Sequence, residues 1–422
     1  MTDALAHARD LADFVVASPS PYHAAEEVAR RLTVAGYVQQ DEAGPWAAGS
    51  GFVVRDGAVI AWRLPARVSS TTPFRIVGAH TDSPTFKLKP NPDLNSAGWQ
   101  QLGMEVYGGP LLNSWLDREL GLAGRLVTAA GEQRLVRTGP ILRIPQLAIH
   151  LDRAVNDEGL RLDKQQHLTP LWGVERRDRR ILDLLAGLAG CKATEIAGWD
   201  VVAFDTAAPA VFGADQEFLA SARLDNLSGV HAGLTALLTA EPSPAISVLA
   251  AFDHEEVGSQ TRSGAAGPFL ADVISRIAAA NGAGRDERYR AYAGSHCLSI
   301  DAGHAVHPNY AGRHDPANHP LLNGGPLLKL NANQRYATDA VGTAMWRRAC
   351  RLAGAGVQEF VSNNTIPCGS TIGPITATAL GIRTIDVGLP LLSMHSAREL
   401  AGTQDPLALA QASAAFLADA TG

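Results

Sequence analysis

Two adjacent glutamates, Glu255 and Glu256, stand in the string FDHEEVGS at 252–259, directly after an apolar run. The run, residues 246–252, is short and follows Pro244, which predicts a buried strand. Neighbouring side chains on extended backbone point in opposite directions, so the two carboxylates can take separate tasks. One can bind a metal ion while the other accepts and returns a proton. An acidic pair on its own is more often an exposed loop.

Four other apolar runs also end in residues that bind metals. In chain order these residues are His80 with Asp82, Asp225 with Asn226, Asp301, and His395. In open α/β sheets, sites gather at the carboxyl ends of strands, so residues this far apart in sequence can form one site. Zinc takes imidazole and carboxylate ligands, and two His, two Asp and one Glu suffice for two ions if one carboxylate bridges them. The sequence therefore predicts a two-metal hydrolytic centre assembled by the fold.

The surrounding sequence predicts the elements that hold these residues. Apolar residues at helical spacing predict helices over 2–16 and 21–36, and apolar runs predict strands over 51–63 and 73–79. Beyond residue 210 we expect helices over 227–240, 267–280, 337–353, 371–380 and 404–420, and strands over 246–252, 296–301, 357–361 and 383–387. This alternation is typical of a three-layer α/β domain with a mainly parallel sheet.

Residues 90–205 differ in character from the rest of the chain. They lack regular strand–helix alternation and are rich in short apolar runs and turns. We interpret them as an inserted, mostly β domain that interrupts a catalytic domain of residues 1–89 and 206–422. A chain of 422 residues is also too long for a single core.

Composition indicates a soluble enzyme of the cytoplasm. A net charge of −6 and a pI near 6.1 provide no basic surface for nucleic acid. The first residues lack the apolar segment of a signal peptide, and polar residues interrupt every stretch that could span a membrane. The 4 cysteines are scattered, which argues against a structural zinc site or a disulfide framework and favours a reducing compartment.

An ordered series of short motifs runs along nearly the whole chain. The motifs are SPSPYH at 18–23, GAHTDSP at 78–84, RIP at 143–145 with LAIH at 147–150, RLDN at 223–226, FDHEEVGS at 252–259, DAGHAVHPNY at 301–310, NQRY at 333–336, PCGSTIGP at 367–374 and MHSARE at 394–399. In this series the chain resembles the aspartyl aminopeptidases, di-zinc exopeptidases that remove acidic N-terminal residues from peptides. The resemblance also implies a catalytic domain interrupted by a smaller β domain that serves oligomerisation.

The resemblance implies two Zn²⁺ ions per subunit, with Co²⁺ or Mn²⁺ as other possible occupants. The implied ligands are Asp225 as the bridge, His80 and Asp301 at one ion, and Glu256 and His395 at the other. The residues alone leave open which ligand meets which ion. In related di-zinc peptidases a cis peptide joins the residues equivalent to Asp225 and Asn226, and we expect it here.

Two further carboxylates are predicted to act beside the metals. Asp82 is placed to accept the second ring N–H of His80, although it could instead cap a turn at the strand end. Glu255 is the predicted general base, because a zinc-bound water has a pKa of about 7 and a nearby carboxylate can take its proton. The proton would pass to the leaving amine after attack on the peptide carbonyl, while the metals polarise that carbonyl.

An acidic substrate side chain requires a cation in the pocket. Lys329 stands in a mostly apolar run and is our candidate, with Tyr336 as a second contact; the alternative is a surface lysine on a strand. Backbone N–H groups of Gly369, Ser370 and Thr371 at a predicted helix start could bind a carboxylate or an oxyanion.

His150 is predicted to act across a subunit boundary. The family implies a tetrahedral dodecamer in which this histidine enters the active site of a neighbouring subunit, near the substrate or the oxyanion. The surrounding segment matches the family, although Gln146 stands where we expect a histidine. From sequence alone, a hydrogen-bonded core histidine in the β domain is the simpler interpretation.

Two other functions stay open at this point. Another di-zinc hydrolase of the superfamily (a broader aminopeptidase, a carboxypeptidase or a deacylase) would share the metal ligands, although a carboxypeptidase would need an arginine fork for the terminal carboxylate. A non-catalytic scaffold would not need an intact ligand set with Glu255. We do not expect Cys368 to act as the nucleophile, because a metal site already supplies one.

Overall fold

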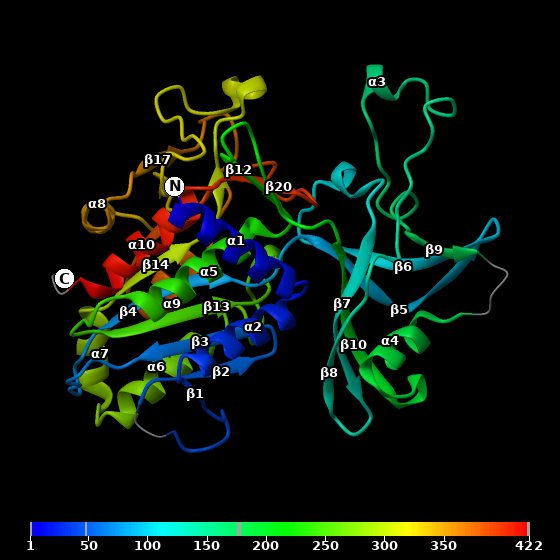
Figure 1. The fold of residues 1–422 in the computed structure, drawn as a ribbon. Coiled ribbons are helices and arrows are strands. Elements are labelled where there is room, and N and C mark those ends of the chain that lie inside the picture. The colour runs from blue at the N-terminus through cyan, green and yellow to red at the C-terminus, as the bar shows by residue number, and fades with distance from the viewer. Residues whose placement is uncertain (1, 47–48, 175–178, 420–422) are drawn as a thin grey trace. The chain divides into compact units, whose positions relative to one another are not determined.

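The computed structural model describes residues 2–46, 49–174 and 179–419, and these fall into two compact units. Unit 1 comprises Met1–Asp82, Pro209–Met394 and Glu399–Gly422, and unit 2 comprises Ser83–Ala208 and His395–Arg398. Figure 1 shows the chain coloured from its N-terminus to its C-terminus. Within the described ranges, none of the helices is both long and apolar enough to cross a membrane.

A nine-stranded sheet forms the centre of unit 1. Its strands, in spatial order, are β1 (Val38–Gln39), β2 (Gly51–Arg55), β3 (Ala58–Arg63), β13 (Ile246–Phe252), β4 (Phe74–His80), β14 (His296–Ile300), β18 (Arg383–Gly388), β16 (Leu327–Leu330) and β17 (Gln358–Val361). The four central strands β13, β4, β14 and β18 are mutually parallel. The sequence predicted one strand over 51–63, which is instead the hairpin β2–β3, because the chain turns at Asp56 and Gly57.

Helices cover both faces of this sheet, as Figure 1 shows. The helices of unit 1 are α1 (Thr2–Ala17), α2 (Pro21–Val34), α5 (Leu224–Thr239), α6 (Phe269–Ala280), α7 (Arg285–Ala293), α8 (Ala340–Ala353), α9 (Ile372–Leu380) and α10 (Asp405–Ala418). The sequence analysis missed α7, whose first eight residues, RDERYRAY, are mostly polar or charged and give no clear apolar face. The predicted α/β class with a mainly parallel sheet is confirmed.

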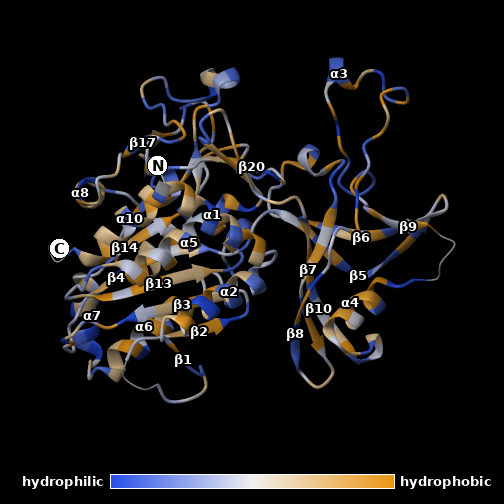
Figure 2. Cartoon of the chain, viewed as in Figure 1, coloured by the Kyte–Doolittle hydropathy of each residue, from blue (hydrophilic) through white to orange (hydrophobic). Residues whose placement is uncertain are grey.

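Alternating side chains of the central strands divide the core into two layers. On β4, Val77 and Ala79 pack with α1, α2, α5, α8 and α10, whereas Phe74 and Ile76 pack with α6, α7 and α9. This is the period-two pattern of a strand buried on both faces, which the continuous apolar runs indicated. Figure 2 shows the apolar colouring along β13.

A smaller five-stranded sheet completes unit 1. Its order is β11 (Ala210–Phe212), β12 (Phe218–Ser221), β20 (Glu399–Gly402), β19 (Pro390–Leu392) and β15 (Gly303–His304). The strand β20 brings Glu399 beside the start of α5, where it accepts a hydrogen bond described below.

Unit 2 is built on a six-stranded antiparallel sheet. Its order is β8 (Gln133–Arg137), β7 (Leu120–Thr128), β10 (Ile196–Asp205), β5 (Thr85–Ser96), β6 (Trp99–Tyr107) and β9 (Leu171–Val174). Two helices, α3 (Val155–Glu158) and α4 (Ile181–Ala189), accompany the sheet. Its own apolar core includes Phe86, Trp115, Leu122 and Leu185. The charged stretch ERRDRR at 175–180 lies partly outside the described residues.

Candidate metal centre

The parallel strands of unit 1 bring distant residues to one edge of the sheet. His80 is the last residue of β4 and pairs in register with Phe252, the last residue of β13. Ser299 on β14 pairs with Gly78, so Asp301 follows level with His80. The turn that carries Glu255 and Glu256 begins three residues after β13. Strand register therefore brings His80, Asp301 and the start of the glutamate turn to one edge of the sheet.

Acidic side chains surround the imidazole of His80, which is almost fully buried. Its Nε2 lies 3.4 Å from Asp225 Oδ1, 3.5 Å from Asp301 Oδ1 and 4.0 Å from Glu255 Oε2. Two groups of unit 1 residues could each hold a metal ion, because the ligand atoms within each group lie within 4.8 Å of one another. One group is His80, Asp225 and Asp301, and the other is His80, Glu255 and Glu256. One imidazole nitrogen with several carboxylate oxygens is a donor set that zinc accepts, so these residues fit the predicted metal.

The electrostatics of the site reflect this crowding of carboxylates. Burial disfavours a charged His80, but hydrogen bonds to Asp225, Asp301 and Asp82 outweigh burial and hold the pKa of His80 well above its usual value. Burial raises the pKa of Glu255 to about 7; Asp301 adds to the rise, and His80 opposes it. A carboxylate with such a pKa can take up and return a proton near neutrality.

Asp82 is fully buried and contacts both the ring of His80 and the turn that carries the two glutamates. Its Oδ1 lies 3.3 Å from Nδ1 of His80, and its backbone carbonyl lies 3.0 Å from the same nitrogen. The same carboxylate accepts the backbone N–H of Glu255 at 3.0 Å and of Glu256 at 3.1 Å. Asp82 thus lies beside the His80 ring, as predicted, and also caps a turn, as the alternative interpretation proposed. The turn that it caps carries the two glutamates. An Nδ1–H tautomer of His80 leaves Nε2 as the ligand atom.

Asp225 is held at the start of α5 by contacts on both sides. Its backbone N–H donates to Glu399 at 3.0 Å, and the amide of Asn226 donates to the carbonyl of Ile300 at the end of β14. The expected cis peptide between Asp225 and Asn226 is present. Both residues have non-helical backbone angles, and Arg223 before them is left-handed with φ 56°. The helix therefore begins with a kink that presents Asp225 to the site.

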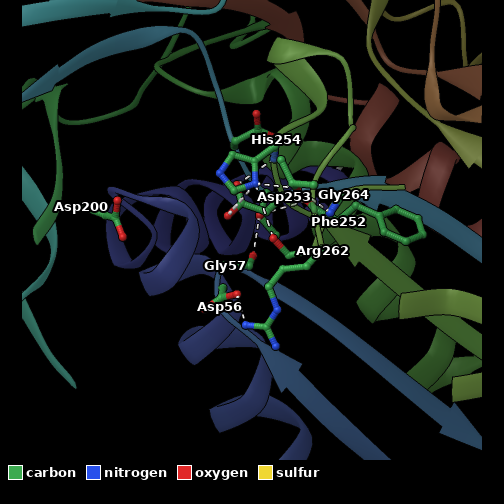
Figure 3. A network of polar contacts seen from close by, with 12 residues as sticks. Asp56, Gly57, Asp200, Phe252, Asp253, His254, Arg262 and Gly264 are labelled. Carbon is green, nitrogen blue, oxygen red and sulfur yellow. Dashed lines mark hydrogen bonds and ion pairs between the residues drawn. The ribbon is translucent and has the colours of Figure 1, made fainter. Parts of the chain in front are cut away.

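A second layer of contacts supports the turn of the glutamates (Figure 3). The buried carboxylate of Asp253 accepts the N–H of His254 at 2.8 Å, and His254 takes the left-handed φ of 64°. A Cβ on Gly57 would lie 2.4 Å from Asp253 Oδ2, so the β2–β3 turn approaches this carboxylate as closely as glycine permits. Thr81 donates to the carbonyl of Gly57 at 2.7 Å.

His395 opens the short segment of unit 2 that lies late in the chain. Its Nδ1 lies 2.9 Å from the carbonyl oxygen of Gly109, and its own carbonyl accepts the N–H of Leu111. An Nδ1–H donor to a carbonyl is the arrangement that makes Nε2 the metal-binding atom of a histidine. The role of His395 as a ligand stays a prediction.

Lys329 lies on β16 and is 2% exposed, so it is not the surface lysine of the alternative interpretation. Its Nζ donates to the carbonyl of Ala302 at 2.6 Å and lies 3.4 Å from Asp301 Oδ2. It also lies 5.4 Å from the ring centre of Tyr336, a cation–π distance. Burial, together with a hydrogen bond to Cys368, raises the pKa of Tyr336. The ammonium group of Lys329 thus lies beside Asp301, one of the predicted metal ligands.

The other predicted substrate contacts lie just before α9. Gly369 and Ser370 are exposed, and the hydroxyl of Ser370 donates to the carbonyl of Arg335 at 3.3 Å. Thr371 is buried and caps the helix, since its hydroxyl accepts the N–H of Gly373. Their roles in substrate binding stay predictions.

His150 is exposed in unit 2, on the loop that follows the RIP motif. A core histidine, the simpler interpretation of the sequence, is therefore wrong. Exposure in one protomer is what a histidine that serves a neighbouring subunit requires, although that role stays a prediction.

Sequence reasoning overlooked several supporting residues of the site. It assigned no role to Glu399, which ends the MHSARE motif, to the amide of Asn226, or to Asp253 and Gly57. It also passed over Asp386, although an aspartate inside the apolar strand 383–388 is a signal that could have drawn attention.

The fold and the donor set define a metal-dependent hydrolase of the α/β class. The family model described as aminopeptidase I zinc metalloprotease (M18) matches residues 14–417, so the chain belongs to the M18 aminopeptidase family. The chain is 55% identical over 420 residues to a probable M18 family aminopeptidase 2 of Streptomyces avermitilis, covering 97% of each chain. It is 44% identical over 420 residues to the protein of that name in Mycobacterium leprae, covering 97% of this chain and 98% of that one.

Solved structures show the same fold. The chain in the Ape4 and Nbr1 complex has a TM-score of 0.95 at 34% identity, with 98% of this chain and 86% of that chain covered. The mApe1 dodecamer of S. cerevisiae has a TM-score of 0.86 at 29% identity, with 97% and 95% covered. The chain is therefore a zinc metallo-aminopeptidase of this family, as the resemblance implied.

The contacts of the two glutamates predict different consequences of substitution. Glu255→Gln should retain the metals and the fold but lower kcat by about 10²–10⁴-fold, because a positioned proton acceptor is removed. Glu256→Gln should instead lower the metal content of the purified protein. Kinetics together with elemental analysis of both variants measure this, and the exposed Glu241→Gln is a matched control. The opposite pattern would show that the roles are exchanged.

Proposed function

We propose that this protein is an aspartyl aminopeptidase that removes N-terminal Asp and Glu from peptides at a di-zinc centre. The observation that carries the specificity is Lys329, a buried ammonium group beside the metal-site residue Asp301. Among the described residues its ammonium group meets Ala302 and Asp301, and an ammonium group has three N–H donors, so a third donor is available for a substrate carboxylate. Membership of an aminopeptidase family sets aside the carboxypeptidase and the deacylase.

In the proposed reaction, residues of the chain hold the metal ions and transfer the proton, and the metal ions would act as the Lewis acid. His80, Asp225, Glu256, Asp301 and His395 would hold two zinc ions, which on binding lower the pKa of a water to about 7 and polarise the peptide carbonyl. Asp82 fixes the ring of His80 and the backbone of the glutamates. Glu255 takes the proton of the attacking water and gives it to the leaving amine.

We also propose a homo-oligomer, a tetrahedral dodecamer, that acts in the cytoplasm. The dodecameric mApe1 of the same fold and the exposed His150 support the assembly. Free thiols at Cys191, Cys297, Cys350 and Cys368 support a reducing compartment.

A broader aminopeptidase is the second candidate, because Lys329 already has a carboxylate partner within the chain. Hydrolysis of peptides that begin with Asp, Glu, Leu, Lys or Ala decides between the two. A clear preference for Asp and Glu supports the proposal, and equal rates on Leu or Ala would replace it with the broader activity.

Removal of metal should abolish hydrolysis, and zinc, cobalt or manganese should restore it. Elemental analysis should find two ions per chain. Metal-free protein should also unfold at a lower temperature, since an ion that binds only the folded state stabilises it. Full activity in protein shown to be free of metal would refute the mechanism.

Lys329→Ala should impair peptides with N-terminal Asp or Glu far more than peptides with Ala or Leu. The substrate carboxylate would enter a buried pocket without its cation, and breaking such a pair typically costs about 3–5 kcal/mol. Values of kcat/KM for each peptide measure the effect. Since Lys329 also lies beside Asp301, metal content must be measured in parallel; an equal loss for acidic and neutral peptides would assign the lysine to the metal site alone.

Mixed oligomers test the role of His150. Subunits that carry His150→Ala are combined with subunits that carry Glu255→Gln, so that some neighbours pair an intact catalytic centre with an intact His150. Activity should then exceed that of either parent, because loss of one donor to the oxyanion costs about 10²–10³ in kcat. Verified mixed oligomers without recovery, or a fully active monomer, would exclude action in trans.

A further inference from the structure

A buried aspartate lies behind the proposed substrate pocket. Asp386 is in the middle of β18, is 0% exposed, and pairs in register with Ser299 of β14. Burial raises the pKa of its carboxyl group. A charged group in such a place requires hydrogen bonds to both oxygens, and the structure provides them.

The two oxygens of Asp386 reach two segments that are distant in sequence. Oδ2 accepts the backbone N–H of Ala337 at 2.6 Å, directly after Tyr336. Oδ1 accepts the hydroxyl of Thr371 at 2.5 Å, directly after Gly369 and Ser370. Each segment thus carries proposed substrate contacts, and one carboxylate holds both.

Backbone contacts of Asp386 strengthen the first connection. Its N–H donates to Thr338 Oγ1 at 2.8 Å, two residues after Tyr336. The aspartate therefore holds the chain after Tyr336 at two points, by its carboxylate and by its backbone. The ring of Tyr336 in turn lies beneath the ammonium group of Lys329.

The start of α9 is fitted to the same carboxylate. The hydroxyl of Thr371 accepts the N–H of Gly373 at 3.2 Å while it donates to Asp386. A Cβ on Gly373 would lie 2.3 Å from Oδ2 and 2.4 Å from Oδ1 of Asp386, so the helix start can lie this close only with glycine there. This contact is independent of the hydrogen bonds and points to the same arrangement.

We infer that Asp386 is a positioning residue for the substrate pocket, which joins the segment of Tyr336 to the segment of Gly369, Ser370 and Thr371. We call this arrangement the Asp386 clasp. The inference rests on the proposed function, because it assumes that these segments bind the N-terminal residue of the substrate. Asp386 itself is too deeply buried to touch substrate, so it acts through Tyr336 and Thr371.

The Asp386→Asn and Thr371→Val variants test the clasp. In Asp386→Asn, the side-chain N–H₂ group faces either the N–H of Ala337 or the hydroxyl of Thr371, so one hydrogen bond is lost. In Thr371→Val, the hydroxyl is removed at almost constant volume. Both should raise KM for the preferred peptide about tenfold, the usual consequence of losing a hydrogen bond to a charged group, with kcat within about threefold and full metal content. Thr371→Ser keeps the hydroxyl and should restore the wild-type KM.

Thr378→Val is the matched control, since its exposed hydroxyl bonds Pro374 within the same helix. If Asp386→Asn does not fold, the Thr371→Val and Thr371→Ser pair decides. Unchanged KM in folded Thr371→Val, or an equal effect of Thr371→Val and Thr371→Ser, would overturn the clasp.

Calorimetry of peptide binding in the Glu255→Gln background measures Kd without turnover, so the test does not depend on catalysis. If the wild-type protein prefers neutral N-terminal residues, the proposed acidic specificity is refuted but the clasp is not. In that case the Asp386→Asn and Thr371→Val variants should show a higher KM for the preferred neutral peptide. Unchanged Kd in folded Thr371→Val within that background would overturn the clasp whatever the substrate preference.

Discussion

Negative charge concentrated around one buried imidazole is the constraint on which the rest of unit 1 depends. Asp82, Asp225, Asp301 and Glu255 all approach His80, and three of these carboxylates are themselves buried. Two like charges about 4 Å apart repel by about 4 kcal/mol at an effective dielectric constant near 20. Protonation of His80 or of Glu255 relieves part of this repulsion, and divalent ions bound there would relieve more of it.

The fold withstands this repulsion by fixing each carboxylate through its backbone. Parallel strands place His80 and Asp301 level at one edge, and a kinked helix start presents Asp225. The backbone N–H groups of the glutamate turn donate to Asp82, and the backbone N–H of Asp225 donates to Glu399. These hydrogen bonds hold each carboxylate near its neighbours, as a preorganised site requires.

Sequence patterns predicted the parts of this arrangement that depend on strands. Runs such as 246–252 are apolar on both faces because both faces are covered, so the strand ends and the polar residues that follow them could be located. Contacts that depend on turns could not be predicted. The close approach of Gly57 to Asp253 and the link from Asp386 to Thr371 join segments whose separation in sequence carries no periodicity, and sequence could propose that Asp82 caps a turn but not that this turn carries the glutamates. The apolar periodicity also did not predict α7, because most of its residues are polar or charged.

Lys329 connects the metal centre with the proposed specificity. Its ammonium group donates to the carbonyl of Ala302 and lies beside Asp301, so it offsets part of the charge of this predicted metal ligand whether or not substrate is present. On the proposed function, its third N–H would donate to the acidic side chain of the substrate. A neutral substrate would then leave that donor buried and unpaired, at a cost of about 1–3 kcal/mol or more for a charged group. Selectivity for acidic residues would thus arise as much from this penalty as from attraction, because a site built around a polar group rejects the ligand that cannot pair with it.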